Sequence, residues 1–167
     1  MKLNKKGIDL VKHFEGCYLK AYRCPAGVLT IGYGHTSGVT EGMEVTKAEA
    51  ETMLMNDLNK VANIIEKFLP KTLNDNQFSA LVSFAFNCGC NALKESTALK
   101  RLINGDINGA AEALTWWNKA TVNGKKVVLK GLVRRREAEK ELFLTFEKNP
   151  NQDIIDMLHK CIKMLEA

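Results

Sequence analysis

The chain has 167 residues, 46% of them apolar and 26% charged, and its formal net charge is +5. This length and apolar content suffice for one substantial core or for two small lobes that share a helix, and they exclude a chain that is mainly disordered. The positive charge suits an anionic partner such as a cell envelope, although it would equally suit weak, nonspecific binding of nucleic acid.

The first predicted element is a short helix that ends at Glu15. Val11 and Phe14 belong to an apolar pattern with helical spacing, and Gly16 suits the position just beyond a helix C-terminus. At such an end, the helix dipole and the unpaired carbonyl groups oppose a negative charge, and partial burial beside Phe14 acts in the same direction. These effects favour a neutral carboxylic acid, which can donate a proton.

A β-hairpin is predicted next. Residues 18–23 and 28–33 alternate in polarity and carry aromatic and β-branched side chains, with turn chemistry between them. Cys24 would then end the first strand and Thr30 would lie within the second, so that both could face Glu15 across a cleft. Taken singly, these residues are more often structural: a solvated acid, a small buried hydrophobe and a strand filler.

A long helix is predicted from residue 47 onward. Thr46 and Glu49 form a capping box, and an apolar stripe then runs from Ala50 to Phe68 and ends before Pro70. At about 1.5 Å per residue, such a helix would exceed roughly 30 Å and could join two lobes. The cleft would lie between these lobes.

The second lobe is predicted to be larger and helical. A helix begins near Asn74, and residues 122–125 have the composition of a tight turn. Trp116 and Trp117 are expected in the core, with stacking on sugar rings as the less favoured reading. Residues 148–167 are expected to form a separate amphipathic helix that packs back on the body.

Three motifs follow one another in the chain. Glu15, eight residues, Cys24, five residues and Thr30 precede the run at 32–36; an apolar run follows at 80–89; and a Gly-Leu-x-x-Arg-Arg motif begins at Gly131. Together they resemble the phage-type lysozymes, or endolysins, over roughly residues 3–147. The resemblance implies an α+β, mainly helical lysozyme-like fold, and we expect the whole chain, 1–167, to form a single domain. It would comprise an N-terminal lobe with a β-hairpin and the inter-lobe helix (1–70), a helical lobe (71–147) and a C-terminal extension (148–167).

The resemblance also implies an activity: hydrolysis of the β-1,4 bond between N-acetylmuramic acid and N-acetylglucosamine in peptidoglycan, leading to lysis of the host cell. Glu15 would be the general acid that protonates the leaving oxygen while a water attacks the opposite face of the sugar. Cys24 and Thr30 would hold this water. In inverting glycosidases the two flanking groups stand about 6.5–9.5 Å apart, which leaves room for the water.

Cys24 departs from the commonest family pattern, because many relatives have Asp at this position. A free thiol has a pKa of about 8.5, so at neutral pH it is a poorer base than a carboxylate. Three roles are open for Cys24: a thiolate base assisted by a nearby cation, a neutral group that positions water, or a covalent nucleophile in a retaining mechanism. We rank the neutral or weakly basic water-positioning role first.

The arginine run at 134–136 and His35 have supporting roles in this interpretation. Adjacent residues of a helix point about 100° apart, so the three arginines cannot all face one site. By resemblance, Arg135 reaches Glu15 and holds it in place, with Arg134 or Arg136 on the surface. His35 is not the general base, since the resemblance implies a structural histidine paired with Asp57.

The five cysteines are odd in number and lack the paired spacing of a zinc site, so we expect reduced thiols, no metal and no cofactor. The first thirty residues contain no apolar run long enough for a signal peptide or membrane anchor. We therefore expect a monomer without a stable membrane anchor that accumulates in the host cytoplasm. The resemblance implies release through holes made by a separate holin, followed by action on the cell wall in the periplasm.

Two rival functions follow from the same residues. The first is a catalytically impaired relative that binds peptidoglycan glycan without cleaving it, and Cys24 is what favours this rival. The second is a basic nucleic-acid binder, which depends on the arginine run alone. We expect bacterial peptidoglycan, and not nucleic acid, to be the partner.

Overall fold

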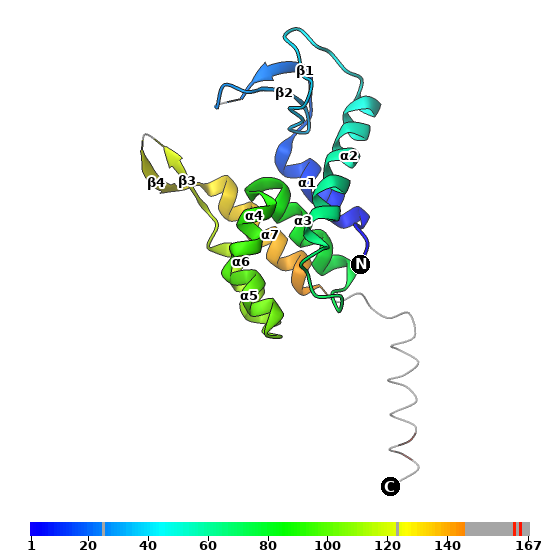
Figure 1. Cartoon of the computed structure of the whole chain (residues 1–167), viewed down its shortest axis with the longest axis vertical. Coiled ribbons are helices and arrows are strands. Elements are labelled where there is room, and N and C mark those ends of the chain that lie inside the picture. The colour runs from blue at the N-terminus through cyan, green and yellow to red at the C-terminus, as the bar shows by residue number, and fades with distance from the viewer. Residues whose placement is uncertain (25, 123, 146–161, 163, 165–167) are drawn as a thin grey trace.

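The computed structural model describes residues 1–24, 26–122, 124–145, 162 and 164. Within them, helices dominate and the strands form two antiparallel hairpins, which confirms the predicted α+β, mainly helical fold (Figure 1). The predicted C-terminal extension lies outside the described residues except at positions 162 and 164, and the division of the chain at residues 70 and 147 stays a prediction. The elements in chain order are α1 (Lys5–Glu15), β1 (Tyr18–Arg23), β2 (Leu29–Gly32), α2 (Lys47–Ile65), α3 (Asp75–Cys88), α4 (Cys90–Glu95), α5 (Thr97–Ile103), α6 (Ile107–Thr115), β3 (Lys119–Val122), β4 (Lys125–Val128) and α7 (Lys130–Leu144).

The first hairpin has the predicted position. β1 has the expected bounds, whereas β2 is shorter than expected and ends at Gly32. Tyr22 pairs with Thr30, so Thr30 lies within the second strand as predicted. Gly32 has a φ of +62°, and a Cβ atom there would lie 3.2 Å from the Cβ of Ala50. Glycine therefore serves both the turn after β2 and the contact of this strand with α2.

α2 begins at the predicted capping box but ends earlier than expected. Thr46 accepts a hydrogen bond from the Glu49 backbone, and the Glu49 side chain accepts one from Thr46 in return. The helix has 19 residues, which at 1.5 Å per residue is about 28 Å and slightly shorter than predicted. It ends at Ile65, where the chain continues into turns whose hydrogen bonds span three residues, as from the Phe68 N–H to the Ile65 carbonyl. Neither α2 nor any other helix in the described part of the chain is long and apolar enough to span a membrane.

α3 is the centre of the helical body. Its side chains are buried on every face from Asn76 to Ala85, as is typical of a helix surrounded by others, and it packs against α1, α2, α4 and α7. α1 approaches it closely, because a Cβ atom on Gly7 would lie 2.5 Å from that of Ser79. The backbone N–H of Asn4 also donates to the Ser79 hydroxyl at 2.9 Å. These contacts fix α1, and with it the position of Glu15, on the core.

The second hairpin was expected only as a tight turn at 122–125. The turn is confirmed, because Val122 pairs directly with Lys125, but the flanking residues add the strands β3 and β4. The expected burial of the two tryptophans is wrong: Trp116 is 52% exposed and Trp117 is 38% exposed. α6 ends at Thr115, so the two tryptophans leave the helical stripe that would have buried them.

Candidate active site

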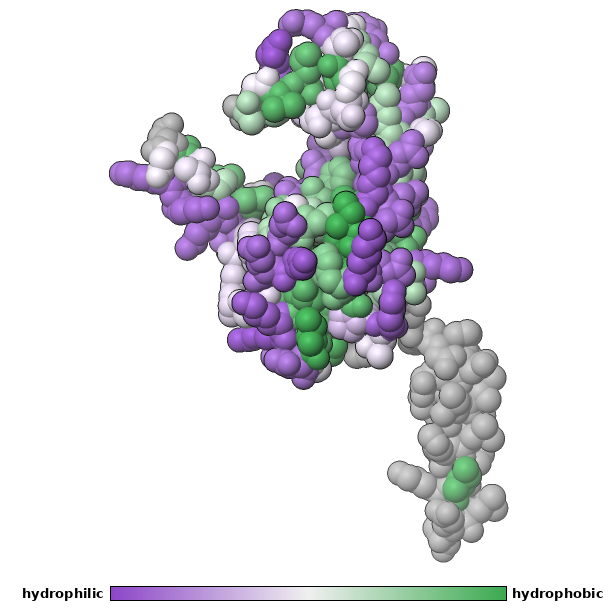
Figure 2. Space-filling model, viewed as in Figure 1, coloured by the Kyte–Doolittle hydropathy of each residue, from purple (hydrophilic) through white to green (hydrophobic). Residues whose placement is uncertain are grey.

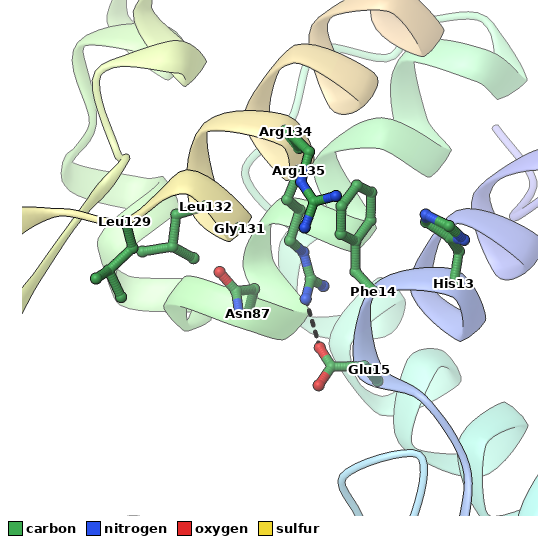
Figure 3. A pocket seen from close by; sticks show the side chains of 9 residues that line it. All are labelled: His13, Phe14, Glu15, Asn87, Leu129, Gly131, Leu132, Arg134 and Arg135. Atoms are coloured by element: carbon green, nitrogen blue, oxygen red, sulfur yellow. Dashed lines mark hydrogen bonds and ion pairs between the residues drawn. The ribbon is translucent and has the colours of Figure 1, made fainter.

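Glu15 is the last residue of α1, as predicted, and the chain turns away at Gly16 with a φ of 68°. Its side chain is 22% exposed, and its Oε1 accepts a hydrogen bond from Arg135 Nη1 at 2.5 Å (Figure 3). The other oxygen, Oε2, lies beside Gly34, where an added Cβ atom would be 3.5 Å from it. One oxygen is therefore held by a cation, and the second is not engaged by that arginine.

The Arg135 side chain is held in place by partners other than Glu15. Its side chain is 3% exposed, so its guanidinium is largely removed from water. Nε donates to Glu139 Oε1 at 3.2 Å, and Nη2 donates to the backbone carbonyl of Ser83 at 3.3 Å. The first partner lies on α7 and the second on α3. Because three of its nitrogens are engaged, Arg135 holds the Glu15 carboxyl group in one place.

A buried ionic network lies behind this contact and was not predicted. Glu139 is fully buried and accepts from the Ser83 hydroxyl at 2.7 Å, while its Oε2 lies 3.2 Å from Arg136 Nη1. Arg136 also donates to Asn87 Oδ1 at 2.6 Å and covers the Phe84 ring at 4.8 Å. Burial raises the pKa of Glu139, and the two guanidinium groups oppose that rise. The i,i+3 and i,i+4 spacing of Glu139 from the two arginines was the sequence signal for this network.

The three arginines diverge as the helical geometry requires. Arg135 faces Glu15, Arg134 is exposed and Arg136 is fully buried. The expectation that one neighbour of Arg135 would lie on the surface holds for Arg134. The deep burial of Arg136 depends on the carboxylate of Glu139, three residues further along α7. The position of Arg136 within the run of three arginines does not indicate this burial.

Cys24 and Thr30 lie together at the end of the first hairpin. The Cys24 N–H donates to the Val28 carbonyl at 3.0 Å, and the Thr30 hydroxyl donates to the same carbonyl at 3.0 Å. Backbone hydrogen bonds from Val28 and Ala26 lower the pKa of the Cys24 thiol, and the Thr30 side chain acts in the same direction. A larger fraction of the Cys24 thiol is therefore ionised near neutral pH than in an ordinary cysteine.

Two cavities adjoin Glu15, and both are also lined by Asn87. One has a volume of about 580 Å³ and the other of about 360 Å³. Neither is lined by Cys24 or Thr30 in the described part of the chain. The structure thus joins Glu15 with Arg135, and Cys24 with Thr30, but it does not place the two pairs around one cavity.

Tyr22 lies near both pairs. Burial raises the pKa of its hydroxyl, and the nearby Tyr18, Cys24 and Glu15 side chains add to the rise. Tyr22 was not predicted as a site residue, although it lies on β1 two positions before Cys24. Its neutral hydroxyl is available as a hydrogen-bond donor at the active-site end of the hairpin.

His35 and Asp57 form the predicted pair on the wall of the smaller cavity. His35 Nδ1 lies 2.5 Å from Asp57 Oδ2, and Nε2 lies 2.8 Å from the Ser37 carbonyl. Both ring nitrogens face oxygens that accept hydrogen bonds, so neither nitrogen is free to take a proton from a substrate or water. This geometry supports the structural role of His35 and opposes a role as general base.

Replacing Asp57 with asparagine should lower the free energy of unfolding by about 1–2 kcal/mol, because the loop at His35 loses a charge-assisted hydrogen bond that is only partly screened by water. Urea denaturation at constant pH measures the change. Lys60→Gln is the matched control, since it removes the exposed partner of Asp57 at 3.1 Å and should cost no more than about 0.5 kcal/mol. Equal effects of the two substitutions would contradict the structural role of the His35–Asp57 pair.

Residues 12–139 match the family described as phage lysozyme. The endolysin of Acyrthosiphon pisum secondary endosymbiont phage 1 is 43% identical over 143 residues, which cover 86% of this chain and 98% of that protein. The endolysin of Bacillus phage B103 is 41% identical over 92% of this chain, which spans only 58% of that relative's length. The muramidase domain of SpmX from Asticaccaulis excentricus has a similar structure, with a TM-score of 0.82 and 41% identity over 87% of this chain and 99% of that one.

Proposed function

Because this chain belongs to the phage lysozyme family, we propose that it is an endolysin that hydrolyses the β-1,4 bond between N-acetylmuramic acid and N-acetylglucosamine in bacterial peptidoglycan. The observation that carries the proposal is the placement of Glu15. A carboxyl group at a helix end, held at one oxygen by buried Arg135 and bordered by two cavities, is suited to protonate a polymer that passes it.

The reaction would begin with proton transfer from Glu15 to the leaving glycosidic oxygen, as positive charge develops on the sugar. Oε2 is the better placed oxygen, because Oε1 is engaged by Arg135. Fixing the acid in this way removes the rotational freedom that would otherwise have to be lost in the transition state. Water would attack the opposite face, held by Cys24 and Thr30 at the end of the first hairpin.

Family membership also supports a setting for this activity. We place the protein in the host cytoplasm before lysis and propose that it acts on the cell wall, in the periplasm, after release by a separate holin. It would act as a monomer. Lysis of the host cell would follow from loss of the glycan strands.

Incubation of the purified protein with isolated peptidoglycan tests the activity. We expect new reducing ends at N-acetylmuramic acid, identified by mass spectrometry of the released fragments, and loss of turbidity. A protein that co-sediments with peptidoglycan but releases no fragments would instead be the glycan-binding relative without catalysis. New reducing ends at N-acetylglucosamine would instead indicate cleavage of the other glycosidic bond and would contradict the assigned bond.

Replacing Cys24 with alanine should lower kcat by roughly tenfold, because the thiol positions the attacking water and does not carry the main proton transfer. Cys24→Asp should retain activity, since a carboxylate can hold the same water. If the thiol instead acts as a base, the pH profile of kcat has a rising limb at the lowered pKa of Cys24 that Cys24→Ala lacks; a water-positioning thiol adds no such limb.

The anomer released first, measured by NMR, distinguishes the third role of Cys24. Direct attack by water inverts the anomeric carbon, whereas a covalent thiol intermediate retains its configuration. We expect inversion. A retained anomer together with a glycosylated Cys24 peptide would contradict the water-positioning role, and near-normal activity of Cys24→Ala would eliminate the thiol as base.

A further inference from the structure

Exposed positive charge is concentrated in one segment of the chain. Residues 113–136 contain seven lysines and arginines and no acidic residue, whereas the other 17 of the 24 basic residues share the rest of the chain with all 19 acidic ones. Arg135 and Arg136 are buried in the ionic network. The other five are exposed and are called the basic cluster here: Lys119, Lys125, Lys126, Lys130 and Arg134.

Exposed apolar side chains gather in the same segment. The described part of the chain has thirteen large apolar side chains that are exposed, and six of them fall within residues 116–129. Scattered apolar residues on a surface are ordinary, whereas neighbouring ones mark a surface that contacts a partner. These six are called the apolar cluster, and each is 37–52% exposed: Trp116, Trp117, Val122, Val127, Val128 and Leu129.

The β3–β4 hairpin separates the two kinds of side chain onto its two faces. Paired residues of an antiparallel ribbon point to the same face, and successive pairs point to opposite faces. One face of the hairpin is therefore mainly apolar and the other is mainly polar. The pairing register assigns Ala120, Val122, Lys125 and Val127 to the first, and Lys119, Thr121, Lys126 and Val128 to the second.

The helical body does not cover this hairpin. Seven of its eight strand residues are exposed, and Figure 1 shows the hairpin extending away from the helices. Figure 2 shows hydrophilic side chains that project from it, with paler and hydrophobic residues beside them. The fold thus leaves the valines of the hairpin in water, so burying them against a partner is favourable.

The two tryptophans are fixed at the base of the hairpin. The Trp117 ring meets the Phe84 ring edge-on at 5.6 Å, and the Arg101 guanidinium lies 5.3 Å from the Trp116 ring. Both rings nevertheless keep an exposed part. Tryptophan is favoured at the boundary between water and lipid, because its ring is apolar and its N–H still reaches a polar partner.

The charge of the segment calls for an anionic partner. Elsewhere on the surface, lysines lie against carboxylates, as Lys20 does at Glu44 (2.7 Å) and Lys140 at Glu112 (2.6 Å). Residues 113–136 contain no carboxylate of their own that could form such a pair. A soluble polyanion would satisfy the lysines but would leave the valines and tryptophans in water. A lipid surface satisfies both, since it offers phosphates above an apolar layer.

We propose that the β3–β4 hairpin, with Trp116 and Trp117 at its base, docks on the surface of an anionic phospholipid membrane. The apolar face of the hairpin enters the boundary between headgroups and acyl chains, and the lysines extend along their apolar stems to reach the phosphates. The docking is peripheral and reversible, because it depends on a small apolar area and on five charges that salt screens.

Vesicles without any glycan test the docking, so its outcome is independent of the proposed function. The chain has two tryptophans, and both lie at the base of the hairpin, so intrinsic fluorescence reports on this site alone. With vesicles that contain phosphatidylglycerol, we expect the emission to shift to shorter wavelength and the protein to co-sediment. Vesicles of phosphatidylcholine should bind it more weakly, and added salt should weaken binding to phosphatidylglycerol.

Two double variants separate the charged and apolar contributions to the Kd for phosphatidylglycerol vesicles. Lys125→Gln with Lys126→Gln should raise Kd roughly 25-fold, since each basic residue at an anionic surface contributes about fivefold. Val122→Ser with Val127→Ser should raise Kd roughly tenfold, because less apolar area leaves water on docking. The second variant should also reduce the shift in tryptophan emission.

Matched controls make the same changes elsewhere on the surface. Lys94→Gln with Lys100→Gln removes two exposed charges on α4 and α5. Ile64→Ser with Ile103→Ser removes two apolar side chains that are 47% and 61% exposed. Both controls should keep Kd within about twofold of the wild type. Controls that weaken binding as much as the hairpin variants do would overturn the docking site.

Two further outcomes would assign the hairpin to another partner. If the valine variant binds vesicles like the wild type, and a DNA duplex binds as tightly as the vesicles, the segment recognises charge alone and membrane docking is overturned. The substituted residues line neither cavity beside Glu15 in the described part of the chain, so both hairpin variants should cleave isolated peptidoglycan at the rate of the wild type. Lost cleavage with unchanged vesicle binding would make the hairpin a glycan contact and would overturn the proposal.

Discussion

Replacing Glu15 with glutamine should lower kcat on peptidoglycan by about 10²–10⁴-fold, the range typical of a lost general acid. The amide cannot donate the proton that the leaving oxygen needs, but its carbonyl can still accept the hydrogen bond from Arg135. Binding of the polymer should therefore change little. The measurements are the rate of reducing-end release under saturating substrate, and co-sedimentation of the variant with cell walls.

A control is needed for the general effect of removing a paired acid. Glu112→Gln serves this purpose, because Glu112 forms an ion pair with Lys140 at 2.6 Å on the surface of the helical body. This variant should keep kcat close to that of the wild type. A Glu15→Gln protein that is folded, as judged by its thermal unfolding, and that retains kcat within tenfold of the wild type would show that another group protonates the leaving oxygen.

The parts of the fold with local signals were predictable from the sequence. The capping box at Thr46 and Glu49 satisfies backbone groups within one turn, so its four residues set the start of α2 without help from the rest of the chain. The first strand of the N-terminal hairpin likewise has the bounds that its alternating pattern indicated. Gly16 follows Glu15 with positive φ, which places the acid at the helix end for a reason contained in the sequence.

The pairs of the candidate site were predictable only through family resemblance. Arg135 is 120 residues from Glu15 in the sequence, and nothing in the run of three arginines selects the one that faces the acid. The partnership of His35 with Asp57 has the same origin. The Arg135–Glu15 and His35–Asp57 distances show that both pairs form. The catalytic roles of Glu15, Cys24 and Thr30 stay predictions until the variants are measured.

The missed features depend on packing between distant segments. The Trp116 and Trp117 side chains were expected inside because of their size and spacing, but α6 ends at Thr115. Trp116 is exposed and lies 5.3 Å from the Arg101 guanidinium, whereas Trp117 packs edge-on against the buried Phe84 ring and still stays 38% exposed. β3 and β4 were missed because their residues are exposed on both faces, which erases the alternation that normally marks a strand.

Replacing Glu139 with alanine should have the largest effect on stability, lowering the free energy of unfolding by about 3–5 kcal/mol. The substitution removes the carboxylate between Arg135 and Arg136 and leaves two buried guanidinium groups with less compensation for their lost hydration. It also leaves the Ser83 hydroxyl without its acceptor. Urea denaturation, with the m-value checked for constancy, measures the change.

Glu137→Ala is the matched control, because it makes the same substitution on the same helix at an exposed position; its effect should stay within about 0.5 kcal/mol. Glu139→Gln separates positioning from stability. Its amide oxygen can still accept from Ser83 and Arg135, so it should unfold less readily than the alanine variant, yet a weaker hold on Arg135 should lower kcat more than it changes KM. If Glu139→Ala and Glu137→Ala destabilise equally, the buried network does not hold α7 against α3, and the fixed position of Arg135 beside Glu15 needs another cause.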